Sequence, residues 1–284
     1  MRQANRAPLR VMLMLAALAL PGTAWAGAIE VFHADSLAGP MRTLKQAFEA
    51  KNPEVTLKLT PGTLKQLAER ILKGEVCDVF APSSPAVVEQ DLLGKTVAGS
   101  DRIAASWYVV FSGNEMVVIT AKGNPLGIGQ IADLAKPGIK LARIAAEKDL
   151  ATARTVEFLS RAAALEGHPE LAKTIIDAAS ATASVPDTVR AVKDGTASAG
   201  VVYYSAAVAA KNDLEIVRFA DSVNMSEAIR NAALVPGTAA NPKEATAFVR
   251  FLLTPEAQTL LQDTGQPPVV PALFKGEVPA EVRS

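Results

Sequence analysis

The sequence predicts an α/β protein of two lobes, each built on a mixed, mostly parallel sheet flanked by helices, with a cleft between the lobes. Short β-type runs alternate with helical patterns along most of the chain, as in parallel sheets whose strands are joined by helices. This alternation occurs in two sets, and the second set begins near Ala105. We find no internal repeat and no low-complexity linker in the 284 residues.

The first set opens with the strand 28–33 (AIEVFH), followed by a helix that Leu44 and Phe48 mark and that ends near Pro53. A glycine, Gly74, is typical of a helix C-terminus and closes the second helix of this set. The remaining predicted elements of the first set are the strand 55–59, the helix 64–73 and the buried strand 78–81.

The second set mixes strands and helices in the same way. Its predicted strands are 108–111, 116–120, 139–142, 199–203, 215–219 and 232–235, and its predicted helices are 152–164, 169–176, 188–193, 243–253 and 255–264. The proline-rich segment 267–271 (PPVVP) predicts an extended tail over the surface. The order of the elements predicts that the chain crosses twice between the lobes, with lobe I at 27–109 plus 230–284 and lobe II at 110–229.

Residues 1–26 have the features of a secretory signal peptide. Three arginines precede an apolar run of ten residues, and Ala24-Trp25-Ala26 provides an A-x-A cleavage site. The run is too short to span a bilayer, which takes about 20 residues. We therefore expect an exported protein, free in the periplasm, that starts at Gly27.

Charge and cysteine content narrow the function further. Without the three arginines of the signal peptide, 26 basic and 29 acidic residues remain, a formal charge of −3 that gives no basic surface for nucleic acid. The single cysteine, Cys77, lies in the apolar run EVCDVFA, so we expect a buried thiol and no intramolecular disulfide. We expect a monomer with no cofactor.

Four loops each place a small or hydroxyl residue just before a predicted helix: 33–37 with Ser36, 60–64 with Thr63, 149–154 with Thr152, and 184–189 with Thr188. Thr63 and Gln66 have capping-box spacing, as do Ser184 and Asp187. A helix N-terminus presents unpaired N–H groups and partial positive charge, so several such ends together could bind an anion without a cationic side chain. Taken singly, each of these residues could simply cap its helix.

A tyrosine, Tyr203, ends the predicted buried strand 199–203 and could extend its hydroxyl into the cleft. The alternative is an ordinary amphipathic aromatic residue with its polar tip in water.

Together these segments resemble the periplasmic molybdate- and tungstate-binding proteins of ABC transporters. The resemblance rests on VFHADSLAGPM near the start, on GTLKQLAERILKGEVCDVFAPSS, and on SVPDTVRAVKDGTASAGVVYYSAAVA. It implies the two-lobed periplasmic-binding-protein fold, with a tetrahedral oxyanion held in the ligand cleft by hydroxyl and backbone N–H groups. It also implies a permease partner in the inner membrane, and no residue that coordinates a metal directly.

The resemblance implies a specific set of ligand-binding residues: Ser36, Gly62, Thr63, Thr152 or its neighbours, Val189 as a backbone donor, and Tyr203. The chain departs from the family pattern at several of these positions. Asp35 places a carboxylate beside Ser36, where the family has a small neutral residue. The second loop reads Pro-Gly-Thr instead of a run of serines, and the third lacks the usual Pro-x-Gly. At Tyr203, archaeal-type tungstate binders have a carboxylate that bonds the metal.

Other functions are open at this point. The ligand could be another anion or a small organic acid, and the scaffold could carry a hydrolase or an interaction protein. His33 and Ser36 could form a hydrolase pair, and Asp35, Asp78 and Asp187 could form a cation site. The motifs G-x-S-x-G, H-E-x-x-H and G-x-x-x-x-G-K-[ST] are absent from the sequence, and we therefore expect a binding protein and not an enzyme.

Overall fold

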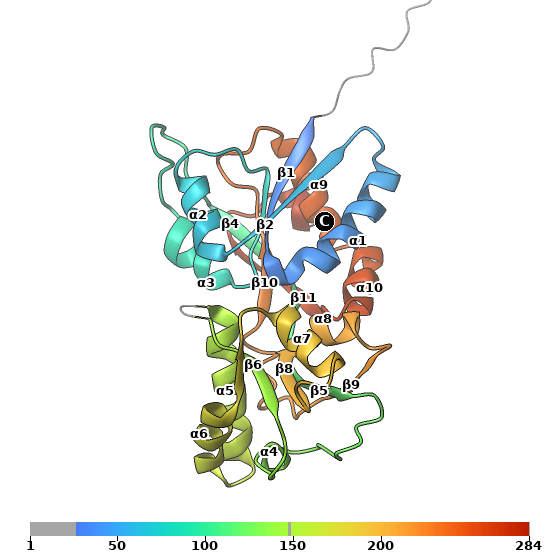
Figure 1. Ribbon diagram of the computed structural model, residues 1–284. Helices are drawn as coiled ribbons and strands as arrows, with labels where there is room; N and C mark the ends of the chain where they lie inside the picture. Colours follow the sequence, from blue (N-terminus) through green and yellow to red (C-terminus); the bar gives the residue numbers. More distant parts are fainter. Residues whose placement is uncertain (1–26, 147–148, 284) are drawn as a thin grey trace, which may run out of the picture.

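The computed structural model describes residues 27–146 and 149–283, which form two lobes, one above the other in Figure 1. The predicted signal peptide, 1–26, lies outside the described residues. In Figure 1 the upper lobe contains both the blue N-terminal and the red C-terminal segments, whereas the lower lobe is green to orange. The first lobe is therefore assembled from the two ends of the chain, and the middle of the chain forms the second.

The first lobe contains a parallel sheet with strand order β2-β1-β3. Its strands are β1 (Ala28–Ala34), β2 (Thr56–Gly62) and β3 (Val79–Ala81). Parallel neighbours need a crossover connection. Helices α1 (Ala38–Lys51) and α2 (Leu64–Leu72) provide the two crossovers. Because the carboxyl ends of parallel strands share one edge, the loops that follow β1 and β2 meet there.

A second sheet of the first lobe is antiparallel, with strand order β10-β4-β11. Its strands are β4 (Trp107–Gly113), β10 (Arg230–Ala233) and β11 (Pro268–Gly276). Phe80 and Leu234 exchange two backbone hydrogen bonds of 3.0 and 3.1 Å, which join this sheet to β3. The segments before and after the second lobe therefore form one continuous layer with the N-terminal strands.

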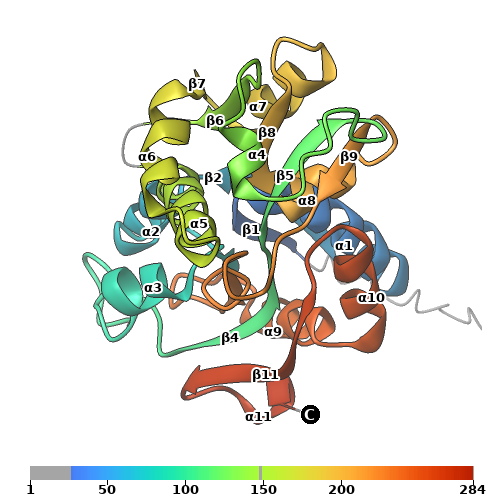
Figure 2. The ribbon, with the colours of Figure 1, turned by 90° about the horizontal axis from the view of Figure 1, so that it is seen from below.

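The prediction of an extended tail over the surface at 267–271 was incomplete, because β11 is a strand of this sheet. Leu273 to Gly276 pair with β4, whereas Pro271, which has no N–H to donate, lies in an irregular stretch between the pairs of Pro268 and Leu273. Figure 2 shows β11 at the outer side of the first lobe, next to the C-terminus.

Three phenylalanines form the centre of the first-lobe core. The rings of Phe48 and Phe248 meet edge to face at 5.1 Å between centroids, and Phe251 lies 5.4 Å from Phe48. They come from α1 and from α9 (Pro242–Leu252), so burial of apolar surface fixes the C-terminal helices to the N-terminal ones. The other helical segments of this lobe are a 3₁₀ turn at Asp35–Leu37, α3 (Pro85–Val87), a π-helical turn at Val88–Leu92, α10 (Pro255–Asp263) and α11 (Ala280–Arg283).

The second lobe has one five-stranded sheet with strand order β7-β6-β8-β5-β9. Its strands are β5 (Met116–Ala121), β6 (Leu141–Ile144), β7 (Ser180–Thr182), β8 (Ala199–Tyr203) and β9 (Leu214–Val217). Its helices are α4 (Ile131–Leu134), α5 (Leu150–Leu165), α6 (Pro169–Ala178), α7 (Val185–Lys193) and α8 (Tyr204–Ala209). Strands β7, β6 and β8 are parallel, whereas β5 is antiparallel to both of its neighbours.

The chain passes between the lobes in two places. It leaves the first lobe after β4, at Asn114 and Glu115, and it returns through 218–229 to β10. Strand β4 thus contains residues on both sides of the boundary expected between 109 and 110. No helix in the described part of the chain combines the length and the apolar character needed to cross a bilayer.

Candidate functional site

A cleft of about 1490 Å³ lies between the two lobes. Its walls are formed by the turns that follow β1 and β2 in the first lobe, and by the starts of α5, α7 and α8 in the second. Of the residues expected to bind ligand, five line it: Ser36, Gly62, Thr63, Val189 and Tyr203. The structure therefore brings together residues that are far apart in the sequence.

Several helices begin at the wall of this cleft. Residues at the starts of α2, α5, α7 and α8 line it, and so does part of the 3₁₀ turn that leads into α1. The first N–H groups of a helix have no partner inside the helix, so they can be directed outward together with the partial positive charge of the helix end. At α8 they are bonded within the protein, because the Tyr204 N–H donates to the Glu115 carbonyl at 2.8 Å and the Ser205 N–H donates to the Asn114 side-chain oxygen at 3.3 Å. The wall thus carries neutral donors from both lobes.

Two of the expected ligand-binding residues, Ser36 and Thr63, bring hydroxyl groups from the first lobe to the cleft wall. Thr63 is the N-cap residue of α2, and its side chain makes no capping hydrogen bond. The predicted capping box with Gln66 is therefore wrong: Thr63 caps through backbone geometry alone, with its carbonyl accepting from the Leu67 N–H at 3.0 Å. Within residues 27–146 and 149–283, neither hydroxyl has a hydrogen-bond partner.

Thr152, by contrast, is not on the wall of the cleft. Its hydroxyl donates to the Ala146 carbonyl and accepts from the Ala146 N–H, both at 3.0 Å. Its own N–H donates to the Asp149 carboxylate, which caps α5. Thr152 thus links Ala146 to the first turn of α5, and its neighbours Leu150 and Ala151 line the cleft instead.

Val189 lines the cleft with no free backbone donor. It is the fifth residue of α7, and in an α-helix the fifth N–H bonds the carbonyl of the first residue. The unpaired N–H of this helix belongs to Val185, because Pro186 has none and the Asp187 N–H donates to the Ser184 hydroxyl. The Ser184 hydroxyl also donates to the Asp187 carboxylate at 2.6 Å. The N-cap bond expected for this pair is therefore present, whereas the carboxylate bonds the hydroxyl and not the backbone N–H that a capping box uses.

Tyr203 ends β8, and its hydroxyl accepts a hydrogen bond of 3.3 Å from the guanidinium of Arg154. The same guanidinium donates to the backbone carbonyl of Ser83 at 3.2 Å. Arg154 is only 6% exposed. Burial raises the pKa of the Tyr203 hydroxyl, with Arg154 opposing the rise, so the phenol keeps its proton at neutral pH.

Arg154 and Ser83 were missed at the sequence level, where only neutral donors were expected. A usable signal existed for Arg154. It lies on the buried face of α5 with Ala151 and Phe158, at the i−3 and i+4 positions. A charged residue on an apolar helical stripe is a sign of a functional or paired group.

The cleft wall also carries ionic side chains. Asp35 lines it and is exposed. The other ionic residues on the wall are Arg42, Lys65, Glu69, Asp149, Lys193, Lys211 and Asp263. Four cations and four carboxylates therefore surround the opening, and the buried Arg154 adds a further positive charge behind the wall.

The alternative sites considered for other functions have structural explanations. His33 is buried with its Nδ1 2.8 Å from the Ala34 carbonyl, and burial lowers its pKa. Asp78 accepts three backbone N–H groups and lies away from the cleft. Cys77 is buried, and burial raises the pKa of its thiol. No group of three or more His, Cys, Asp or Glu residues suited to a metal ion occurs among the described residues.

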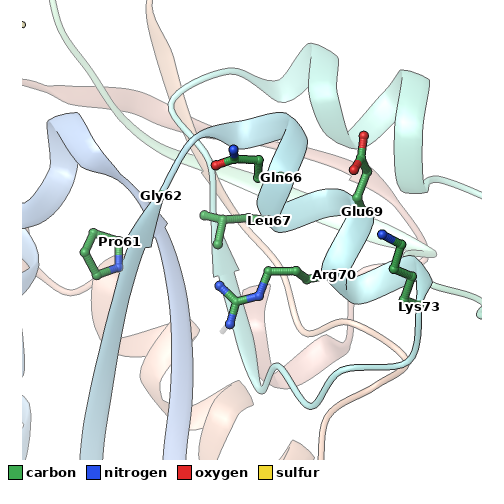
Figure 3. A pocket seen from close by; sticks show the side chains of 7 residues that line it. All are labelled: Pro61, Gly62, Gln66, Leu67, Glu69, Arg70 and Lys73. Atoms are coloured by element: carbon green, nitrogen blue, oxygen red, sulfur yellow. The ribbon is translucent and has the colours of Figure 1, made fainter.

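A smaller pocket of about 310 Å³ adjoins the cleft where β2 meets α2. Figure 3 shows Pro61 and Gly62 on the strand, Gln66 and Glu69 on the helix, and Lys73 directly after the helix. The pocket shares Gly62, Gln66 and Glu69 with the cleft, so we treat it as a side extension of the cleft.

Comparison with known proteins agrees with this architecture. The family model described as bacterial extracellular solute-binding protein matches residues 29–266. The molybdate-binding protein ModA of Mycobacterium bovis is 26% identical over 243 residues, covering 86% of this chain and 85% of that protein.

Solved structures confirm the predicted fold. The periplasmic molybdate-binding protein of Azotobacter vinelandii has a TM-score of 0.64 at 17% identity, covering 86% of this chain and 99% of that one. The sulfate-binding protein SubI of Mycobacterium tuberculosis has a TM-score of 0.63 at 18% identity, covering 86% and 88%. The two-lobed periplasmic-binding-protein fold and the resemblance to molybdate-binding proteins are thus both confirmed. With its family model spanning almost the whole described structure, this chain belongs to the bacterial extracellular solute-binding proteins.

Proposed function

We propose that this protein is the periplasmic receptor of an ABC importer and that it binds a tetrahedral oxyanion, molybdate or tungstate, between its two lobes. The observation that carries the proposal is the convergence of helix starts from both lobes on one cleft, together with the partner-free hydroxyls of Ser36 and Thr63. Neutral donors and helix N-termini are a recurrent way to bind anions. The molybdate-binding relatives favour molybdate within that class.

Binding would close the cleft. A space of about 1490 Å³ exceeds the 300–1,000 Å³ typical even of sites for drug-sized ligands, so we expect the walls to approach each other around a small oxyanion. Donors of the first lobe, such as Ser36, and donors of the second, such as the Val185 N–H, would then bond the same anion. Because only the closed state makes both sets of contacts, the ligand shifts the population toward it.

The closed shape would be the signal read by the partner. We propose that a membrane permease recognises the closed form of a monomeric receptor and takes up the released anion. No side chain needs to bond the metal atom of the oxyanion, since hydroxyl and N–H groups act on its oxygens.

Isothermal titration calorimetry of the purified protein tests the proposal. We expect stoichiometric binding of sodium molybdate or tungstate, with sulfate, phosphate and a panel of small organic acids as competitors. A ligand at a thousand times its Kd stabilises the native state by about 4 kcal/mol. For a chain of this size that is roughly a 10 °C rise in Tm.

Small-angle X-ray scattering of the same samples should show a smaller radius of gyration with the anion. No heat and no rise in Tm with any of the four oxyanions would refute the oxyanion proposal. A response to an organic acid alone would retain the receptor and replace its ligand.

A further inference from the structure

Arg154 is a buried cation for which the described residues provide no paired carboxylate. The residue is 6% exposed, and in the described part of the chain it forms no ion pair. Its hydrogen bonds go to two neutral oxygens, the Tyr203 hydroxyl and the Ser83 carbonyl. Buried charges in proteins are nearly always paired, because removal from water costs several kcal/mol per ion. Among the described residues no carboxylate offsets this charge, so a bound anion is a candidate partner for it.

Both acceptors of Arg154 lie on the wall of the cleft, one in each lobe. Ser83 follows β3 of the first lobe, and Tyr203 ends β8 of the second. Arg154 itself is not a wall residue, so its charge is placed directly behind the surface that a ligand would touch. A negative charge in the cleft would offset it.

The hydrogen bond to Tyr203 also fixes the direction of the phenol proton. A guanidinium can only donate, so the Tyr203 oxygen must be the acceptor in this bond. The Tyr203 proton must then point elsewhere, and within residues 27–146 and 149–283 it meets no acceptor. Tyr203 is a wall residue, and we therefore infer that its proton points into the cleft.

We propose that Arg154 is a positioning residue for anion binding: it commits the Tyr203 hydroxyl to donate into the cleft and offsets the charge of the bound anion from behind the wall. This inference rests on the proposed function. It extends that function, because the buried guanidinium of Arg154 would then attract the negative charge of the ligand, in addition to the neutral hydrogen-bond donors. Arg154 would also favour fully ionised anions over neutral ligands of similar size.

A double-mutant cycle with sodium molybdate as the probe tests the proposal, using Arg154→Met, Tyr203→Phe and the double variant. We expect each single change to weaken binding at least about ten-fold, the loss typical of one hydrogen bond to a charged group. The double variant should bind within about two-fold of the weaker single variant, because the two residues act through one hydrogen bond. Arg161→Met is the matched control on the same helix, since its guanidinium pairs with Glu157 and Glu227 at the surface.

The outcomes separate the two proposals. Failure of the wild-type protein to bind molybdate, tungstate, sulfate or phosphate would remove the proposed function itself. If the wild type binds and Arg154→Met binds with unchanged affinity, the role of Arg154 is overturned and the receptor proposal stands. The same conclusion follows if the affinity loss of the double variant is the product of the losses in the two single variants. Should Arg154→Met fail to fold, Arg154→Lys takes its place in the cycle. A lysine keeps the charge but cannot make both bonds in the same geometry, so an intermediate affinity supports the proposal and an unchanged one overturns it.

Discussion

Asp78 is the residue whose replacement we expect to destabilise the first lobe most clearly. It is fully buried, and its carboxylate links three segments of the chain. One oxygen accepts from the N–H groups of Ala240 and Asn241 at 2.8 and 2.7 Å, and the other accepts from the Glu30 N–H at 2.8 Å. These bonds join β1, the start of β3 and the loop before α9.

The change Asp78→Asn keeps one acceptor oxygen and replaces the other by an NH₂ group. If the amide oxygen faces Ala240 and Asn241, the Glu30 N–H meets a donor and is left unsatisfied, at about 1–3 kcal/mol. The two remaining bonds lose the extra strength that a charged acceptor gives. Part of this loss is offset because a neutral amide is easier to bury. We expect a net loss of about 3 kcal/mol, a large fraction of the 5–15 kcal/mol that stabilises a typical protein.

Urea denaturation followed by tryptophan fluorescence measures this loss, because Trp107 lies in the first-lobe core. The exposed Asp101→Asn is the matched control and should change stability by less than about 0.5 kcal/mol. A loss below 1 kcal/mol in Asp78→Asn would refute the structural role. Stabilisation of the wild-type protein by Ca²⁺ or Mg²⁺, abolished in Asp78→Asn, would instead support the cation site considered from the sequence.

Three further predictions concern the cleft and the crossing between the lobes. Thr63→Val should weaken molybdate binding in calorimetry and leave Tm nearly unchanged. Thr152→Val should lower Tm, because it breaks two hydrogen bonds to Ala146. The reverse pattern would contradict the ligand-binding role of Thr63 and the structural role of Thr152. Asp35→Asn should tighten molybdate binding about five-fold, because a like charge about 4 Å away costs on the order of 1 kcal/mol even in water; unchanged affinity would mean that Asp35 lies far from the anion. Burial raises the pKa of Glu115 above its ordinary 4.5, with Arg218 opposing. Protonation of Glu115 therefore stabilises the folded state. The stability of the wild type relative to Glu115→Gln should be greatest below about pH 4.5 and should fall as the pH rises through the raised pKa. Melting curves from pH 4 to 8 in which this stability difference stays flat or rises would disprove the prediction.

The fold could be predicted because it depends on patterns that are local in the sequence. The strand 199–203 and the helix that follows Pro169 were both found from runs of apolar residues and their boundaries. Strand β11 was not, because its pairing with β4 joins residues more than 150 positions apart, and its prolines indicate an irregular segment when they are considered alone.

The location of the candidate site could be predicted from the sequence, but the hydrogen bonds of its residues could not. Ser36, Thr63 and Tyr203 follow strands or begin helices, and parallel strand ends meet at one edge, so their convergence could be expected. The sequence does not show which residues lie near a hydroxyl, and these neighbours decide whether the hydroxyl has a hydrogen-bond partner. Thr152 and Thr63 both stand at helix starts, yet only Thr152 meets the Ala146 backbone. The partners of Arg154 likewise come from the segment after β3 and from the end of β8, one in each lobe.

The first lobe is assembled from both ends of the chain, and this affects the order in which the two lobes can fold during synthesis. Strand β4 is made early, but its partners β10 and β11 begin only at Arg230 and Pro268. When the last residues of β9 have been made, the second lobe has all of its strands, and both edges of β4 are still without partners. Chains normally fold as segments become available. The second lobe can therefore fold before the first lobe is complete. Truncation near the C-terminus should destabilise the first lobe, which also contains the N-terminal strands.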